Sequence, residues 1–236
     1  MMKVEVKGGV RRFIIIGNGE LDNLEVLRKT IKKNDLIIAV DGGADYVNKL
    51  SLSPDYIIGD LDSVKTLPKE DKSIQILKFS KEKDKTDTEI AIEFALKNKA
   101  SEILLFGMTS QSRIDHSINN IFLLENLAKR RIKNTLFVNS FTRLSAVKRG
   151  MNLYRKDGDL VSLIPLTKKV SGIITEGLKY KLEKESLSRD KTRGISNIII
   201  EKEAEIRFDE GVLLVIQIGE VARGELSFRA GARNLL

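Results

Sequence analysis

Carboxylates and one arginine follow short apolar runs of the sequence, each at the point where a run ends. The residues after the runs at 36–40, 56–59 and 103–107 are Asp41, Asp60, Asp62, Arg113 and Asp115. Carboxylates that are brought together repel one another unless a hard cation lies between them. Mg²⁺ fits best, because it binds oxygen ligands and is normally shared between one or two carboxylates and the phosphates of a substrate. A guanidinium beside them would bind phosphate oxygens.

Two further carboxylates, Asp84 and Asp87, precede an amphipathic stretch and would join the same group. Taken singly, an aspartate at a strand end is more often a helix cap or a turn residue. His116 is likewise more often a capping or packing residue than a base. The clustering of these side chains, rather than any one of them, favours a site for phosphate and metal.

The composition excludes several other kinds of chemistry. The chain has 236 residues, 42% of them apolar, so it can bury a large core. There is no Cys, and His116 is the only His. A disulfide framework, a thiolate zinc site, a Cys nucleophile and a multi-His metal site are therefore excluded. Catalysis would have to depend on carboxylates, Lys, Arg and backbone amides.

The net charge of +8 raises the alternative of a non-catalytic nucleic-acid-binding module. Such a module would lose affinity steeply with salt. The basic side chains are spread over the whole chain, and its Tyr and Phe lie mostly in apolar runs, so an anionic small ligand explains the charge equally well. No apolar run approaches the length of a membrane span, and none at the start resembles a signal segment, which favours a cytoplasmic protein.

The spacing of apolar residues in the first 140 positions predicts the elements that would position these side chains. Short β-branched runs alternate with amphipathic stretches, as in a parallel sheet with crossover helices. The predicted strands are 13–17, 36–40, 56–59, 74–79, 103–107 and 136–138, and the predicted helices are 21–33, 44–50, 86–99 and 115–131. Ligands bind beyond the carboxyl ends of such strands, so the loops that carry the carboxylates should converge on one crevice.

Three local motifs add detail to this part of the chain. The clearest helix opens with Thr86-Asp87-Thr88-Glu89, a capping box. Gly42-Gly43 predicts a tight turn from strand to helix. Gly17-Asn18-Gly19 suggests a phosphate loop, but only weakly, because the third Gly of a dinucleotide fingerprint is missing.

After about residue 145 the period of the pattern changes to two, which predicts antiparallel strands. Two hairpin signals occur there, Asp157-Gly158 and Asp209-Glu210-Gly211, each between two alternating runs. The sequence thus predicts an α/β N-terminal domain with a mainly parallel Rossmann-like sheet, residues 1–145. An all-β antiparallel sandwich domain, residues 146–236, is expected to follow.

Seven segments of the chain resemble, in order and spacing, the motifs of the thiamine pyrophosphokinase family. They are Asp41-Gly42-Gly43-Ala44, the segment 54–63 with Gly59-Asp60-Leu61-Asp62-Ser63, the segment 83–89, Ser112-Arg113-Ile114-Asp115-His116, and the segments 162–166, 175–180 and 194–197. The resemblance covers nearly the whole chain.

The resemblance implies an activity. That family transfers a pyrophosphoryl group from ATP to the hydroxyl of thiamine, which gives thiamine diphosphate and AMP. Asp60, Asp62 and Asp87 would hold Mg²⁺ on the triphosphate and, with Asp41 at the same crevice, act as catalytic residues. The general base stays open, because Asp87 and Asp115 are both candidates and the metal could acidify the hydroxyl unaided.

The resemblance also implies substrate contacts and a homodimer. Residues 1–145 would bind ATP and Mg²⁺, while residues 146–236 would bind thiamine and form the dimer. The implied contacts are Arg113 and Asp115 for the nucleotide, and Ser196, Asn197, Asp84 and Thr86 for substrate, with Ser196 and Asn197 reaching thiamine from the partner subunit. The chain departs from the family at Gln111-Ser112, where a Gly pair is common, and it has no Trp to stack on thiamine.

A rival interpretation treats the segment 56–64 as the motif of a phospho-aspartate phosphatase. Asp60 would then be the nucleophile and Asp62 the acid and base. In that class, however, the motif lies on the first strand, and a later strand ends in Gly-Asp or Asp-Asp, whereas no later strand predicted here ends in such a pair. A covalent phosphoryl group on Asp60, or inorganic phosphate in place of AMP, would favour this alternative.

Overall fold

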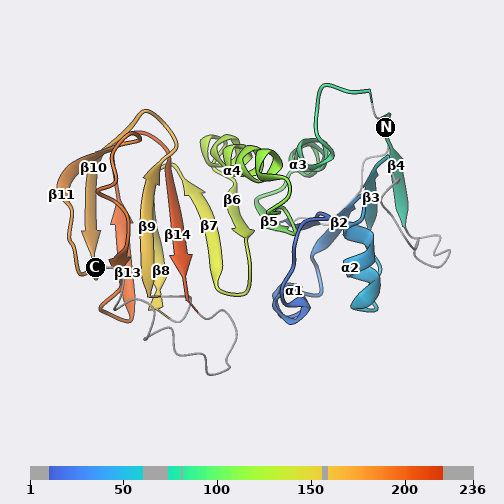
Figure 1. Ribbon diagram of the computed structural model, residues 1–236, viewed down its shortest axis with the longest axis horizontal. Coiled ribbons are helices and arrows are strands. Elements are labelled where there is room, and N and C mark those ends of the chain that lie inside the picture. Colours follow the sequence, from blue (N-terminus) through green and yellow to red (C-terminus); the bar gives the residue numbers. More distant parts are fainter. Residues whose placement is uncertain (1–10, 61–73, 81, 156–158, 220–236) are drawn as a thin grey trace. The chain divides into compact units, whose positions relative to one another are not determined.

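The computed structural model describes residues 11–60, 74–80, 82–155 and 159–219 (Figure 1). The chain divides into two compact units, Met1–Asn139 and Ser140–Leu236, each of which is described by itself. The division lies before the boundary at residue 145 that the sequence predicts, because the strand Thr142–Val147 pairs with Leu213–Ile218 of the second unit.

Strands and helices alternate in the first unit. In chain order they are β1 (Arg12–Ile16), α1 (Leu24–Thr30), β2 (Leu36–Val40), α2 (Gly43–Lys49), β3 (Tyr56–Gly59), β4 (Gln75–Lys78), α3 (Asp87–Lys97), β5 (Glu102–Phe106), α4 (Ile114–Lys129) and β6 (Lys133–Phe137). Each predicted strand and helix of this part is confirmed, with ends that differ by a few residues. The largest difference is at α1, which begins later than predicted because the Asn23 side chain caps it by accepting a hydrogen bond from the N–H of Glu25.

The six strands form a parallel sheet in the order β6-β5-β1-β2-β3-β4. Strand β1 is fully buried from Phe13 to Ile16, as expected for a strand that is covered on both faces. From β1 the chain adds strands first on one side and then, with β5 and β6, on the other. The order therefore reverses between β1 and β5, and this is the point where an open α/β sheet binds its ligands.

The helices cover both faces of this sheet. Right-handed crossovers place helices on opposite faces when the direction of strand addition reverses. Accordingly α1 and α2 lie on one face, and α3 and α4 lie on the other (Figure 1). The rings of Tyr56 in β3 and Phe94 in α3 pack at a centroid distance of 4.5 Å, which fixes α3 over the sheet.

The second unit contains only strands. They are β7 (Thr142–Val147), β8 (Gly150–Tyr154), β9 (Leu160–Pro165), β10 (Lys169–Glu176), β11 (Glu183–Ser188), β12 (Asn197–Ile198), β13 (Glu203–Arg207) and β14 (Leu213–Ile218). Their pairings within the unit are antiparallel, in the orders β12-β9-β14-β7 and β11-β10-β13-β8. Both sheets contribute to one core, for example through Val161 and Val215 from the first sheet and Leu153 and Ile206 from the second. The unit is the predicted antiparallel sandwich.

The two predicted hairpins are wrong, although the strands beside them are present. Strand β8 pairs with β13, while β9 pairs with β14 and β12. Strand β13 likewise pairs with β8 and β10, and not with β14. A turn signal reports that the chain reverses, but in a sandwich the next strand can join the opposite sheet. Asp157 and Gly158 lie outside the described residues, but in both cases the two flanking strands belong to different sheets.

No helix in the described part of the chain is long and apolar enough to cross a membrane.

Candidate active site

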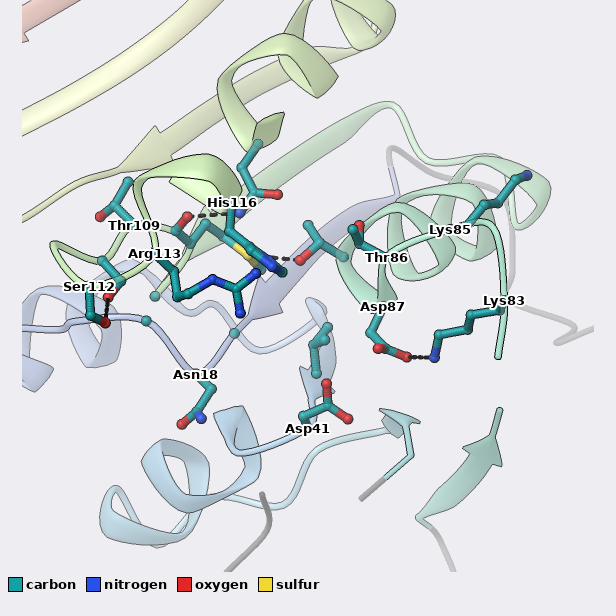
Figure 2. A pocket seen from close by; sticks show the side chains of 18 of the residues that line it. Asn18, Asp41, Lys83, Lys85, Thr86, Asp87, Thr109, Ser112, Arg113 and His116 are labelled. Atoms are coloured by element: carbon teal, nitrogen blue, oxygen red, sulfur yellow. Dashed lines mark hydrogen bonds and ion pairs between the residues drawn. The ribbon is translucent and has the colours of Figure 1, made fainter. Parts of the chain in front are cut away.

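A cavity of about 660 Å³ lies at the carboxyl ends of β1, β2 and β5 (Figure 2). It is lined by the loops that follow these strands and by the first residues of α3 and α4. The lining segments are 17–19, 40–41, 83–88 and 107–110, with Ser112, Arg113, His116 and Asn120. The cavity therefore coincides with the point where the strand order reverses, as predicted for an open parallel sheet.

The loops after β1 and β5 pack backbone against backbone at the base of this cavity. The N–H of Gly17 donates to the Phe106 carbonyl at 2.8 Å, and the N–H of Gly19 donates to the Gly107 carbonyl at 2.7 Å. A Cβ on Gly19 would overlap the carbonyl oxygens of Gly107 and Thr109, so the approach requires glycine. The N–H groups of Gly17 and Gly19 thus already donate to the end of β5 and the residue after it, while the segment 17–19 still lines the cavity.

Asp41 reaches the cavity from the end of β2. It adopts a φ of 47°, which Asp tolerates better than most residues, and its N–H donates to the Ile58 carbonyl at 3.1 Å. Gly59 has a φ of 147°, and a Cβ there would overlap the Asp41 carboxylate. The bare backbone of Gly59 thus allows the Asp41 carboxylate to lie against the end of β3, where Asp60 follows.

Of the predicted acidic pair, Asp60 and Asp62, only Asp60 lies among the described residues. Asp60 is half-buried directly after β3, but it is not among the residues that line the cavity. Asp62 lies outside the described residues. Within the described ranges no three His, Asp or Glu side chains form a group that could hold a metal ion.

The start of α3 brings Asp84, Thr86 and Asp87 to the cavity, as the sequence predicts. The hydroxyl of Thr86 caps the helix by accepting a hydrogen bond from the N–H of Glu89 at 3.2 Å. The Lys83 ammonium pairs with the Asp87 carboxylate inside the cavity (Figure 2). The sequence alone does not predict this ion pair.

Arg113 lines the cavity, whereas Asp115 bonds Arg113 from outside the lining. The guanidinium donates to both carboxylate oxygens of Asp115, from Nε at 3.0 Å and from a terminal nitrogen at 2.8 Å. These hydrogen bonds lower the pKa of Asp115 to about 2. His116 lies beside the pair, with its Nε2 atom 3.8 Å from an Asp115 oxygen. Asp115 therefore orients Arg113.

Two buried polar residues of α4 hold the loop after β5 and were missed from the sequence. Asn120 donates from its side-chain amide to the Met108 carbonyl at 2.8 Å. The Ser117 hydroxyl accepts from the N–H of Ser110 at 2.9 Å. The signal that could have identified them is polar residues three apart on the otherwise apolar, sheet-facing side of a predicted helix.

Gln111, which with Ser112 replaces the common Gly pair of the family, forms a contact of its own. The N–H of Gln111 bonds the Glu20 carboxylate at 3.2 Å, which ties the loop after β5 to the loop after β1. The hydroxyls of Ser110 and Ser112 lie 2.9 Å apart. Ser112 still lines the cavity, although Gln111 does not.

Ser196 and Asn197 lie in the second unit, and their contacts are described within that unit. Ser196 is exposed with a φ of 60°, and its N–H bonds the Ser162 hydroxyl at 3.1 Å. The buried Asn197 side chain accepts from the N–H of Tyr180 at 3.0 Å and donates to the Tyr180 carbonyl at 2.7 Å. Asn197 thus fixes the backbone of Tyr180, whose side chain is 52% exposed.

Comparisons with known proteins give the same family for both units. A family model described as "Thiamin pyrophosphokinase, catalytic domain" matches residues 27–136. A second, described as "Thiamin pyrophosphokinase, vitamin B1 binding domain", matches residues 150–213. The first match falls within the first unit and the second match within the second unit.

Individual relatives agree with these matches. The thiamine pyrophosphokinase of Bacillus subtilis is 27% identical over 210 residues, which cover 86% of this chain and 96% of the relative. The crystal structure of thiamin pyrophosphokinase from Geobacillus thermodenitrificans superimposes with a TM-score of 0.76 at 28% identity, over 89% of this chain and 99% of that one. The Bacillus subtilis crystal structure gives a TM-score of 0.78 at 23% identity, with the same coverage of both chains.

The two family matches leave only residues 137–149 uncovered between positions 27 and 213, and they follow the order of the two units. Relatives of the same name match over most of their own length. Of the motif residues that first suggested the relationship, Asp41, Asp84, Asp87 and Arg113 line the cavity at the carboxyl ends of β1, β2 and β5. The chain belongs to the thiamin pyrophosphokinase family.

Proposed function

We propose that this protein transfers a pyrophosphoryl group from ATP to thiamine, with the cavity of the first unit as the nucleotide site. The observation that carries the proposal is the convergence of Asp41, Asp87 and Arg113 on that cavity. Carboxylates suit a cation that accompanies a triphosphate, and a guanidinium suits the phosphate oxygens. Family membership supports thiamine as the acceptor and opposes both the nucleic-acid-binding module and the phospho-aspartate phosphatase.

The donor set in and beside the cavity fits Mg²⁺. Asp41, Asp84 and Asp87 supply hard carboxylate oxygens to the lining. Mg²⁺ is usually held by one or two carboxylates plus substrate phosphates, so a group of three acidic ligands is not required. Asp87, Asp60 and Asp62 would hold it, with Asp41 in support. When bound, it would neutralise charge that develops on the phosphates.

In the transfer step, the hydroxyl oxygen of thiamine attacks the β-phosphorus of ATP. A new bond forms between them, the bond from that phosphorus to the oxygen bridging the α- and β-phosphates breaks, and AMP leaves with that oxygen. The hydroxyl proton passes to a base or to water. Arg113, oriented by Asp115, binds phosphate oxygens and stabilises the transition state. Asp115, with a pKa of about 2, is a poor proton acceptor, so Asp87 and unaided acidification of the hydroxyl by the metal are the alternatives that the proposal keeps.

The substrate contacts of the other predicted residues are part of the same proposal. Asp84 and Thr86 belong to the cavity lining, which supports their contact with substrate. Ser196 is exposed, which supports its contact with thiamine, while the amide of Asn197 is already bonded to Tyr180. Asn197 would therefore act on thiamine mainly by fixing Tyr180 and Ser196.

We further propose that the protein works as a homodimer whose active site lies at the subunit interface. Helix α4 begins at the cavity and presents three exposed apolar side chains, Ile114, Ile118 and Phe122, at 64%, 47% and 50% exposure. They are spaced four apart and so share one face of the helix. A second copy of the chain would bury this face. Localisation in the cytoplasm stays a prediction from the sequence.

The test is product analysis with a matched pair of variants. ATP, Mg²⁺ and thiamine are expected to give AMP and thiamine diphosphate in equal amounts, measured by chromatography. Asp87→Asn should lower kcat/KM by about 100-fold or more, because it removes a charge from the cavity. Asp45→Asn is the control, since Asp45 lies in the first turn of α2 and is not in the lining.

Two results would contradict the proposal. The first is formation of inorganic phosphate from ATP without any thiamine product, which would indicate a phosphatase. The second is unchanged turnover by Asp87→Asn, which would show that the reaction does not use the carboxylate given the metal role in this cavity.

A further inference from the structure

Lys83 and Asp87 form an ion pair inside the cavity. The Lys83 ammonium contacts an Asp87 carboxylate oxygen, and the two side chains are only 17% and 19% exposed. Figure 2 shows them pointing toward each other. The Lys83 ammonium also lies over the Phe79 ring, 5.8 Å from its centre, so the charged group has an aromatic neighbour as well as the carboxylate. In this structure the cation beside Asp87 is thus supplied by the chain itself.

Lys85, two residues further on, is arranged differently. Its ammonium pairs with Glu93 of α3, and these side chains are 44% and 37% exposed. In Figure 2 it points away from Asp87. Of the two lysines that flank Asp84, Lys83 is therefore the one bonded to a proposed metal ligand.

An ammonium group and a divalent cation compete for the same carboxylate, because their charges repel each other. If Asp87 binds Mg²⁺, Lys83 must give up its partner in a place with little access to water. An unpaired charge in such a place costs free energy, so Lys83 needs another anion. The polyphosphate of ATP, which enters the same cavity in the proposed function, is that anion, and an ammonium group is a common phosphate ligand.

We propose that Lys83 exchanges partners, from Asp87 before MgATP binds to the polyphosphate of ATP afterwards. This inference rests on the proposed function and adds a residue to it. Lys83 occupies the carboxylate until the metal arrives with its nucleotide, and it then binds the phosphates. Free metal ion is therefore bound weakly, and MgATP is bound tightly.

The exchange predicts effects of opposite sign for one substitution. Lys83→Met keeps the length of the side chain and removes its charge. Without nucleotide, the affinity for Mn²⁺, measured by electron paramagnetic resonance, should rise about tenfold, because Asp87 loses its competitor. At saturating Mg²⁺, the affinity for ATP, measured by calorimetry, should fall about tenfold, because a phosphate contact is lost.

Two further variants are the controls. Lys97→Met should change both affinities by less than about twofold, since Lys97 lies in the last turn of α3 and is not in the cavity lining. Lys83→Arg keeps the charge, so the affinity for Mn²⁺ without nucleotide should stay weak and the affinity for ATP at saturating Mg²⁺ should stay tight. Circular dichroism and thermal unfolding establish that each variant is folded.

The outcomes separate this inference from the proposed function. A fall of both affinities in Lys83→Met would show that Lys83 has a structural role. Unchanged affinities would show that Lys83 acts on neither the metal nor the nucleotide. Either result overturns the exchange. If the wild-type protein bound no ATP, the proposed function itself would be wrong, and the exchange with it. Opposite changes in Lys83→Met alone would establish the exchange.

Discussion

Gly59 and Asp41 depend on each other at the carboxyl end of the sheet. Gly59 has a φ of 147°, a conformation that L side chains rarely adopt, and its missing Cβ leaves room for the Asp41 carboxylate. The sequence showed Gly-Asp-Leu-Asp after an apolar run, but it could not show that the glycine makes room for an aspartate of the preceding loop.

We expect Gly59→Ala to destabilise the protein by about 1–3 kcal/mol through backbone strain, with an added cost from overlap with Asp41. Chemical denaturation measures the change. In an Asp41→Ala background the same substitution should cost less, because the overlap is gone while the strain remains. Equal costs in the two backgrounds would contradict the contact between Gly59 and Asp41.

The location of a single residue in the site could be predicted when the residue directly follows a strand. Asp41 and Arg113 follow parallel strands, so their meeting at one edge required only the strand assignment. The partners of side chains could not be predicted in this way. Whether Lys83 or Lys85 faces Asp87 depends on the path of the segment before α3, which has no periodic pattern.

At the scale of elements, local patterns identified strands and caps but not strand partners. The Thr86 cap and the start of α3 were visible as a capping box, because both depend on neighbouring residues. The pairing of β8 with β13 joins residues about 50 positions apart in the sequence, and no local signal reports it. The errors in the sandwich therefore concern connections and not the strands themselves.

Asp55 connects β2 with the segment before β3, and its charge affects the stability of this part of the sheet. Its carboxylate accepts a hydrogen bond from the N–H of Ile37 at 2.8 Å, and burial raises its pKa above the ordinary value. A pKa that is higher in the folded than in the unfolded state means that the charged form destabilises the fold. This contribution to stability is present below the ordinary Asp pKa of about 3.9 and is lost as the pH rises through the folded value.

Asp55→Asn keeps an acceptor for Ile37 and removes the charge. At pH 7 we expect it to be as stable as the wild type or more stable by up to about 1 kcal/mol, with the advantage disappearing in acid. Asp55→Ala removes the acceptor and should cost about 1–3 kcal/mol. Urea denaturation at several pH values measures both. A variant Asp55→Asn that loses stability at pH 7 and regains it in acid would contradict the assigned direction of the pKa shift.

At the scale of the whole molecule, the exposed apolar face of α4 predicts association. Ile118→Lys should convert a dimer to a monomer in analytical ultracentrifugation, and because the position is exposed it should change the stability of the chain by less than about 0.5 kcal/mol. Asn119→Lys is the control, since it adds the same charge about 100° around the helix. A wild type that is monomeric at micromolar concentration, or a variant that stays dimeric, would contradict the role given to this face.

In the proposed reaction the β- and γ-phosphates of ATP are transferred together to thiamine, in the cavity at the carboxyl ends of β1, β2 and β5. It is tested most directly with ATP labelled with ³²P at the γ-phosphate, incubated with Mg²⁺ and thiamine and separated by chromatography. We expect the label in thiamine diphosphate, with unlabelled AMP in the same amount. Label in inorganic phosphate or in thiamine monophosphate, with ADP as the second product, would rule out transfer of a pyrophosphoryl group.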